Sequence, residues 1–353
     1  MTRIEKIQAQ LKEQELDAVV LFSESNVRYA GQFAFTDGAV AVARDRALLL
    51  TDSRYIEAAQ AEARDVEVRL VDSRHPLSAQ LRDFLSGCNR VAAEEQRLPY
   101  ADWKRLEEKL ETALLPGDAL LAGLRAVKDP EEIAALTAAQ RIAEQALAEV
   151  LPYIRPGVRE RDIAAELTYR MLRLGGEGNS FDPITITGPN TSKPHGVPGE
   201  AAVRPGDFVT MDFGTLVNGY HSDMTRTVAV GHATEEMRRV YDTVLRAQLA
   251  GIERMRAGTT GAEVHKAAED IIAAAGYGGC FGHGFGHSVG LEIHEDPGAS
   301  PRNTRPLPAG AVVTAEPGIY LPGAFGVRIE DMIHVTAQGP ENLTAAPKDL
   351  LIL

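Results

Sequence analysis

The chain has few cysteines, no long apolar run and fewer basic than acidic residues. Cys88 and Cys280 are its only cysteines, too few for a disulfide framework or a zinc finger, so we expect a reducing, cytoplasmic setting. The N-terminus places Ile4, Ile7 and Leu11 at helical spacing among charged residues, so we expect an amphipathic helix there and no signal peptide. No segment is apolar over the length of a membrane span, and we expect no membrane partner.

Basic residues are too few to form a broad surface for nucleic acid. Lys and Arg total 37 against 50 Asp and Glu, which gives a formal net charge of −13. Affinity for a phosphate backbone depends mainly on clustered Lys and Arg, so we expect no nucleic-acid partner. The excess acid can serve solubility, and it can also reflect carboxylates gathered in a site that cations neutralise.

The sequence predicts a small α/β domain followed by a second domain. A chain of 353 residues exceeds the size at which one hydrophobic core usually stops growing. In the first part, helical patterns alternate with short β-branched or leucine-rich runs such as Val40–Leu50. A new helix is expected at Pro130, because Asp129 can cap it and acids follow in its first turn. We therefore expect domains at residues 1–124 and 125–353.

The second domain contains a faint internal repeat with an offset of 101 residues. Arg155-Pro-Gly157 corresponds to Arg256-Ala-Gly258, and Gly175 corresponds to Gly276. Each half then reads helix, Gly turn, helix, Gly and strands. The first half ends in an Asp-bearing pair of strands and the second half in a Glu-bearing pair.

A first hairpin is predicted over residues 207–230, where two β-type runs flank a turn with an Asn-Gly pair. A turn centred between Val217 and Asn218 places Asp212 opposite Asp223, with their Cβ atoms about 5 Å apart. Two carboxylates at that distance repel each other. Alternatively, the hairpin has another register or Asp223 points to solvent.

A second hairpin is predicted over residues 311–335, closed by a Pro/Gly loop near Gly323. A symmetric turn there places Glu316 opposite Glu330. Each of the two hairpins then sets acid against acid. That arrangement costs stability unless cations lie between the carboxylates.

Three of the nine histidines lie in a glycine-rich segment between the hairpins, over residues 281–295, and they are His283, His287 and His294. The glycines let the backbone approach a site closely. The segment matches neither G-x-G-x-x-G nor H-E-x-x-H. A single histidine is more often a packed or exposed residue than a ligand, but three histidines beside four paired acids favour a metal site.

Four carboxylates and one imidazole form an oxygen-rich set for two divalent ions, because four negative charges balance four positive charges. This set favours manganese, cobalt, zinc or iron over copper or a thiolate site. Two ions about 3.5–4 Å apart can share a water molecule, lower its pKa and polarise a carbonyl group. The sequence therefore predicts a two-metal hydrolase.

Five motifs follow one another along the chain: Met-Asp212-Phe-Gly, Ser-Asp223-Met-Thr-Arg, Gly-His-Gly-Phe-Gly-His287, Glu316-Pro-Gly-Ile-Tyr and Val-Arg-Ile-Glu330-Asp. In this order they resemble the motifs of the pita-bread metallopeptidases, and the first domain resembles the creatinase-type N-terminal domain. The resemblance covers essentially the whole chain. It implies an α/β creatinase-like domain followed by an α+β pita-bread catalytic domain with a pseudo-twofold repeat.

The resemblance implies a ligand set for each metal ion. Asp212, Asp223 and Glu330 would hold one ion, and Asp223, His287, Glu316 and Glu330 would hold the other, so that Asp223 and Glu330 bridge. Glu316 would also handle the proton of the attacking water. Manganese is the favoured metal, with zinc, cobalt and iron as alternatives.

The resemblance also implies residues that contact the substrate. His195 and His294 would bind or polarise the substrate at the scissile carbonyl, and His283 would line the pocket. The alternatives are a loop histidine for His195 and a structural hydrogen bond for His283. Arg328 would orient carboxylate ligands through its planar guanidinium, and Tyr320 would contact the site. Both could instead be packing residues.

The wording of the motifs resembles the proline-specific branch of the family, which implies peptides with proline at the second position as substrates. An Xaa–Pro bond lacks an N–H group and therefore needs a dedicated pocket. A dipeptidase commonly carries an arginine soon after the position of His294, where this chain has Gly298, although Arg302 could substitute. We expect an Xaa-Pro aminopeptidase, with an Xaa-Pro dipeptidase (prolidase) as the alternative.

Two further readings are a metal-free pita-bread binding module and a creatinase-like amidinohydrolase. The presence of all five predicted ligands argues against both, because neither uses the metals. A homodimer is implied by the relatives only.

Overall fold

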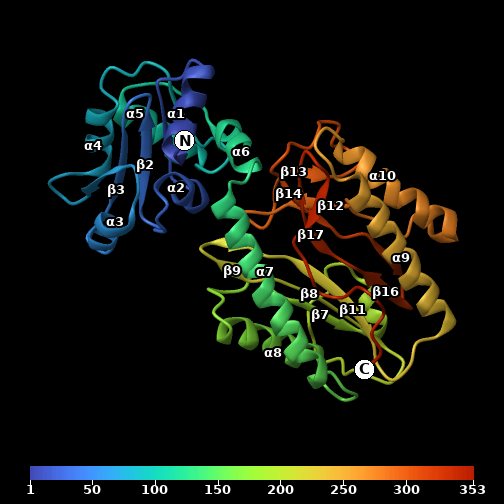
Figure 1. Ribbon diagram of the computed structural model, residues 1–353. Coiled ribbons are helices and arrows are strands. Elements are labelled where there is room, and N and C mark those ends of the chain that lie inside the picture. Colours follow the sequence, from blue (N-terminus) through green and yellow to red (C-terminus); the bar gives the residue numbers. More distant parts are fainter. The chain divides into compact units, whose positions relative to one another are not determined.

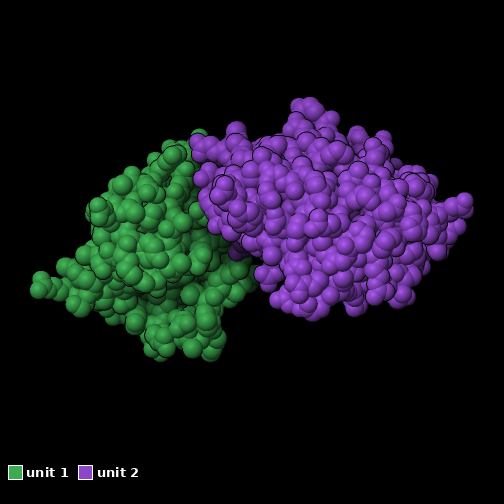
Figure 2. Space-filling view, turned by 90° about the horizontal axis from the view of Figure 1, so that it is seen from below, with its two compact units in different colours: residues 1–125 green, residues 126–353 purple.

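The computed structural model describes residues 1–353, which form two compact units, Met1–Arg125 and Ala126–Leu353 (Figure 2). The division lies one residue beyond the domain boundary expected from the sequence. None of the helices combines the length and the apolar character that crossing a bilayer requires.

The first unit is built on a six-stranded mixed sheet with the strand order β4-β3-β2-β1-β5-β6. Its strands are β1 (Ala18–Leu21), β2 (Gly38–Ala43), β3 (Ala47–Thr51), β4 (Glu67–Leu70), β5 (Val91–Ala93) and β6 (Leu114–Pro116), and its helices are α1 (Arg3–Glu13), α2 (Glu24–Gly31), α3 (Ile56–Glu62), α4 (Leu77–Phe84), α5 (Tyr100–Leu110) and α6 (Asp118–Ala126). The predicted N-terminal helix is α1, which buries Ile4, Ile7 and Leu11. The run Val40–Leu50 spans two antiparallel strands, β2 and β3.

The second unit consists of four long helices and two main sheets. The helices are α7 (Pro130–Val150), α8 (Glu160–Arg173), α9 (Glu235–Arg254) and α10 (Gly261–Ile272). One sheet has the order β11-β8-β7, from β7 (Ile184–Thr187), β8 (Phe208–Phe213) and β11 (Met224–Ala229). The other has the order β13-β12-β14-β17-β18, from β12 (Gly286–Ser288), β13 (Glu295–Ala299), β14 (Val312–Ala315), β17 (Asp331–Val335) and β18 (Pro340–Asn342). Two short ladders, β9 (Leu216–Val217) with β10 (Tyr220–His221) and β15 (Gly318–Leu321) with β16 (Phe325–Arg328), complete the two hairpins.

Helix α7 begins where the sequence predicts. The Asp129 side chain accepts a hydrogen bond from the Glu132 N–H, and the Glu132 side chain accepts one from the Asp129 N–H, which forms a capping box with Pro130 in the first turn. Such a cap satisfies N–H groups that have no partner within the helix and contributes about 1 kcal/mol.

The internal repeat predicted from the sequence recurs in the helices. Helices α8 and α10 begin at Glu160 and Gly261, which keeps the offset of the sequence repeat. The glycine before each of them, Gly157 and Gly258, has a φ of +92° in both halves. The α7–α8 pair packs against β7, β9 and β10, and the α9–α10 pair packs against β13, β14 and β16 (Figure 1).

The first hairpin has a register that differs from the predicted one. Thr225, and not Asp223, lies opposite Asp212 in the β8–β11 ladder, so the predicted pairing of the two aspartates is wrong. The loop consists of Asn218 and Gly219, with φ values of +50° and +72°. A two-residue loop of this kind needs positive φ at both central residues, so its centre lies between Asn218 and Gly219, one residue later than predicted.

The second hairpin has the predicted register. Ala315 pairs with Asp331 on one side, and Gly318 pairs with Arg328 on the other. Glu316 and Glu330 occupy the positions between these two ladders, in line with the register of both. The hairpins therefore deliver four acids to one region of the second unit.

We expect Gly219→Ala to lower the free energy of unfolding by about 1 kcal/mol, because a side chain disfavours the left-handed conformation of that residue. Urea unfolding followed by circular dichroism measures the change. Gly278→Ala is the matched control, since Gly278 has a φ of −53° and a Cβ there would make only van der Waals contact, 3.8 Å from the Cβ of Ala273. Equal effects of the two substitutions would contradict the role of positive φ in this turn.

Candidate metal centre

A pocket of about 790 Å³ in the second unit collects all the predicted site residues, which are His195, Asp212, Asp223, His283, His287, His294, Glu316, Tyr320, Arg328 and Glu330. Its other walls include Phe181, Ile184 and Ile293, together with glycines of the segment 279–286. These residues come from both halves of the repeat. The tertiary fold, and not one local motif, therefore creates the site.

The four acids enter the pocket from the ends of strands. Asp212 lies in β8 and Asp223 directly before β11, while Glu316 follows β14 and Glu330 precedes β17. Asp212 Oδ1 and Asp223 Oδ1 are buried and accept no hydrogen bond. Two carboxylates are thus held with an oxygen lone pair directed into a buried space, which is costly unless a positive charge is present.

Burial and mutual repulsion disfavour the ionised forms of these acids. Burial, reinforced by the charges of Asp212 and Glu316, raises the pKa of Asp223 well above its usual value. Burial, reinforced by Asp223 and Glu316, does the same to the pKa of Glu330. Burial raises the pKa of Glu316 to about 8, although Arg328 and a hydrogen bond from Thr314 oppose the shift.

His287 presents an unprotonated nitrogen to the acids. Its Nδ1 lies 3.2 Å from the carbonyl oxygen of Ser288, which can only accept, so Nδ1 carries the proton. Its Nε2 lies 3.5 Å from Asp223 Oδ2 and 3.4 Å from Glu316 Oε1. Burial lowers the pKa of His287 to about 4, so the ring is neutral near pH 7 and Nε2 bears a lone pair.

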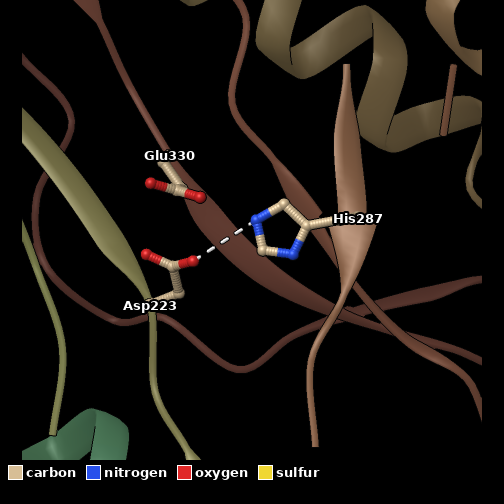
Figure 3. A group of neighbouring side chains, drawn as sticks. All are labelled: Asp223, His287 and Glu330. Carbon is tan, nitrogen blue, oxygen red and sulfur yellow. Dashed lines mark ion pairs between the residues drawn. The ribbon is translucent and has the colours of Figure 1, made fainter. Parts of the chain in front are cut away.

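The lone pair of His287 Nε2 therefore faces the lone pairs of the carboxylate oxygens across the centre of the pocket. One ligand atom each from Asp223, His287 and Glu330 lies within 4.8 Å of the others, and Figure 3 shows the three side chains pointing toward one another. Carboxylate oxygens and a neutral imidazole are the ligands that divalent first-row metals accept. The donor set fits divalent cations, which would supply the positive charge that the cluster lacks.

Arg328 holds the edge of this cluster. The buried guanidinium donates from Nη2 to Asp212 Oδ2 at 2.6 Å and from Nε to Thr225 Oγ1 at 3.0 Å. Its Nη1 donates to the hydroxyl of Tyr320 at 2.9 Å and to the carbonyl of Pro194, next to His195, at 3.2 Å. One planar group thereby fixes the orientation of an acid and of the pocket wall, as the sequence suggested.

His283 is tied to Arg328 through Tyr320. His283 Nδ1 lies 2.8 Å from the carbonyl oxygen of Gly284 and must donate to it, so Nε2 accepts from the Tyr320 hydroxyl at 2.9 Å. Burial lowers the pKa of His283 to about 4, in agreement with a neutral ring. His283 lines the pocket and also makes a structural hydrogen bond, which are the two roles that the sequence left open for it.

Two threonines that the sequence reasoning missed orient the acids. The Thr225 hydroxyl donates to Glu330 Oε2 at 2.6 Å, and the Thr314 hydroxyl donates to Glu316 Oε1 at 3.1 Å. Each threonine lies two residues from an acid, Thr225 after Asp223 and Thr314 before Glu316. Residues two apart in an extended chain share a face, so this spacing was the available signal.

The remaining predicted residues lie at the open side of the pocket or outside it. His195 and His294 line the pocket and are exposed to solvent, and the His294 ring lies edge-on to His287 with a centroid distance of 4.2 Å. Gly298 and Arg302 do not line the pocket, and Arg302 is exposed. The pocket therefore receives no guanidinium from the segment after His294.

Comparisons with known proteins agree over the length of the chain. The models "Metallopeptidase family M24" and "Creatinase/Prolidase N-terminal domain" match residues 134–337 and 3–127. The chain is 35% identical to an Xaa-Pro dipeptidase of Pyrococcus furiosus over 99% of both proteins. An Xaa-Pro dipeptidase from Bacillus anthracis superposes with a TM-score of 0.95 at 39% identity over 99% of both chains. An X-Pro aminopeptidase from Thermotoga maritima gives a TM-score of 0.93 at 34% identity, over 98% of this chain and 100% of its own.

We expect the metal-free protein to lose stability as the pH rises from about 5 to about 8. The folded-state pKa of Glu316 is about 8 against 4.5 for an ordinary glutamate, so the folded state keeps a proton that the unfolded state releases. That contribution is present at low pH and is lost as the pH rises through the folded pKa. Thermal unfolding of chelator-treated protein measures the loss, and added Mn²⁺ should restore the melting temperature at pH 8.

Glu316→Gln should reduce the slope of this pH dependence, because an amide does not ionise, while Asp223 and Glu330 still contribute to it. Glu253→Gln, at an exposed position, serves as the control and should leave the slope unchanged. If the melting curves of Glu316→Gln and the unmodified protein ran in parallel over this range, the raised pKa of Glu316 would be refuted.

Proposed function

Because the chain belongs to metallopeptidase family M24, among its Xaa-Pro dipeptidases and aminopeptidases, we propose that it removes the N-terminal residue from peptides with proline at the second position. The predicted creatinase-like N-terminal domain and pita-bread catalytic domain are confirmed by the same matches. The protein is a metallo-exopeptidase, and its family implies divalent metal ions.

Five side chains would hold two ions. The assignment gives Asp212, Asp223 and Glu330 to one ion and Asp223, His287, Glu316 and Glu330 to the other, with Asp223 and Glu330 bridging. The observation that carries it is the position of the unprotonated Nε2 of His287, which lies 3.5 Å from Asp223 Oδ2 and 3.4 Å from Glu316 Oε1. In the same pocket, Asp212 Oδ1 and Asp223 Oδ1 are buried and accept no hydrogen bond. Manganese is favoured by the oxygen-rich set, with zinc, cobalt or iron as alternatives. When bound, the ions would lower the pKa of a water molecule and polarise the scissile carbonyl.

The residues around the cluster would transfer a proton, bind the substrate and orient the metal ligands. Glu316 would accept the proton of the attacking water, with its carboxylate oriented by the hydroxyl of Thr314. His195 and His294 line the pocket and are exposed to solvent, and they would bind or polarise the substrate at the scissile carbonyl. Arg328 and Tyr320 would keep Asp212 in place and do not contact the reacting atoms.

The apolar lining of the pocket supports recognition of proline. Phe181, Ile184 and Ile293 give it an apolar wall, which suits a pyrrolidine ring. The scissile Xaa–Pro amide has no N–H to donate, so recognition must use the ring and the carbonyl groups instead.

The charges of the pocket favour an aminopeptidase over a dipeptidase. A dipeptidase must bind the carboxylate of the proline residue, and Arg328 is the only arginine or lysine among the lining residues. Arg328 already donates to Asp212, Thr225, Tyr320 and the backbone of Pro194. The dipeptidase reading stays the alternative, because the solved structures similar to this chain include dipeptidases as well as an aminopeptidase.

Two further properties belong to the proposal. The free thiols of Cys88 and Cys280 support the cytoplasmic location expected from the cysteine count. A homodimer is proposed from the family resemblance alone, and light scattering of the purified protein tests it.

Chelator-stripped protein should regain activity with Mn²⁺ and then cleave Xaa-Pro-Yaa at least about tenfold better, in kcat/KM, than Xaa-Pro, because no arginine or lysine that lines the pocket is free to bind the proline carboxylate. Steady-state hydrolysis of the two peptides, repeated with Co²⁺ and Zn²⁺, makes the measurement. Glu316→Gln is the inactive control. Preference for the dipeptide would make the protein a prolidase, and absence of cleavage of either peptide would refute the proposed function.

Gly298→Arg should shift the preference toward the dipeptide by about tenfold, since it supplies the missing cation after His294. The site has room, because a Cβ at Gly298 would meet its nearest neighbour, the carbonyl oxygen of Gly286, at 3.5 Å. Gly298→Gln is the control, because it adds a polar side chain without a charge. Identical peptide preferences in the two variants would mean that a charge at this position does not reach the substrate.

A further inference from the structure

We propose that Lys128 is a positioning residue for His294 and acts through a buried ion pair with Glu295; this inference rests on the proposed contact of His294 with substrate. Lys128 Nζ lies 2.9 Å from Glu295 Oε2. Only 1% of the lysine side chain and 5% of the glutamate side chain are exposed. The two residues are 167 positions apart, so the pair joins the segment before α7 to the first residue of β13.

A buried ion pair is poor evidence for stability, because desolvation of both charges opposes their attraction. The pair nevertheless constrains the structure, because moving Lys128 away from Glu295 would leave both buried charges uncompensated. The pair is therefore expected to fix the position of whatever is attached to it. Glu295 is attached directly to His294.

The turn that carries His294 is wrapped around the Glu295 carboxylate. Glu295 Oε1 accepts the N–H of Glu292 at 3.2 Å, and the N–H of Gly290 donates to the carbonyl of Glu292 at 3.0 Å. Gly290 lies so close to the carboxylate that a Cβ there would stand 2.5 Å from Glu295 Oε2. The Glu295 carboxylate thus packs inside the turn 290–295 and accepts one of its N–H groups. Ile293 and His294, which belong to this turn, line the pocket.

The other end of the ion pair is anchored. The N–H of Lys128 donates to the carbonyl of Gly310 at 2.9 Å, and the capping box that starts at Asp129 follows directly. The ammonium therefore pulls the carboxylate toward a fixed point of the backbone. Without the ammonium group the turn can shift. The His294 ring, whose centroid lies 4.2 Å from that of the His287 ring, would then move with the turn.

A double-mutant cycle separates positioning from general stability. Lys128→Met removes the charge and keeps the length of the side chain. We expect kcat for Xaa-Pro-Yaa to fall about tenfold to a hundredfold, as for a small misplacement of a catalytic group, with the bound-metal content unchanged. In a His294→Ala background the same substitution should change kcat less than twofold, because the group that Lys128 positions is already gone.

Hydrogen exchange of the backbone amides of residues 290–295 gives a readout that does not depend on activity. We expect faster exchange in Lys128→Met than in Tyr220→Phe, a control that removes another buried hydrogen bond to the start of α7, the one between Tyr220 and Glu132. Should the unmodified protein cleave no Xaa-Pro peptide, the proposed function fails, and the exchange data still decide whether Lys128 holds the turn.

Lys128→Met/Glu295→Gln covers the case in which the single variant does not fold, since it leaves no unpaired buried charge and keeps an acceptor for Glu292. It should fold and still show a reduced kcat and faster exchange at residues 290–295. Equal effects of Lys128→Met with and without His294, or unchanged exchange and kcat in the double variant, would overturn the proposal.

Discussion

Repulsion among four buried carboxylates is the constraint on which the second unit depends. Asp212, Asp223, Glu316 and Glu330 share one pocket, and burial with like charges disfavours their ionised forms. An isolated hairpin would not hold such groups together. The acids stay in place because the strands that carry them are buried in two hydrophobic cores, one formed by the first half and one formed mainly by the second half. The fold thus stabilises an arrangement that is unfavourable by itself, and the divalent cations that the family implies would turn it into a favourable one.

The polar groups around the acids keep this arrangement specific. Arg328 donates to one oxygen of Asp212 and leaves the other without a hydrogen bond, and Thr225 donates to one oxygen of Glu330. His287 turns its protonated nitrogen to the backbone and its lone pair to the acids. Arg328 is the one cationic side chain that pairs with the four acids, so the centre still lacks positive charge.

The sequence predicted the residues of the site better than their geometry. The loop of the second hairpin is symmetric about Gly323, so Glu316 and Glu330 could be placed opposite each other correctly. In the first hairpin the Asn218-Gly219 pair contained the information for the register, but the turn was centred one residue too early and Asp223 was set opposite Asp212. The ion pair of Lys128 could not be predicted, because 167 residues separate it from Glu295 and no periodicity links the two.

The repeat has a consequence for the origin of the site. Asp212 and Asp223 belong to its first half, and Glu316 and Glu330 belong to its second. Neither half alone contains the cluster. An ancestral polypeptide with a single repeat would have needed two copies of itself to gather four carboxylates, with its centre on the symmetry axis between them. Within one chain the two halves need not be identical, and His287 lies in the second half only, an asymmetry that a symmetric pair of identical chains could not have.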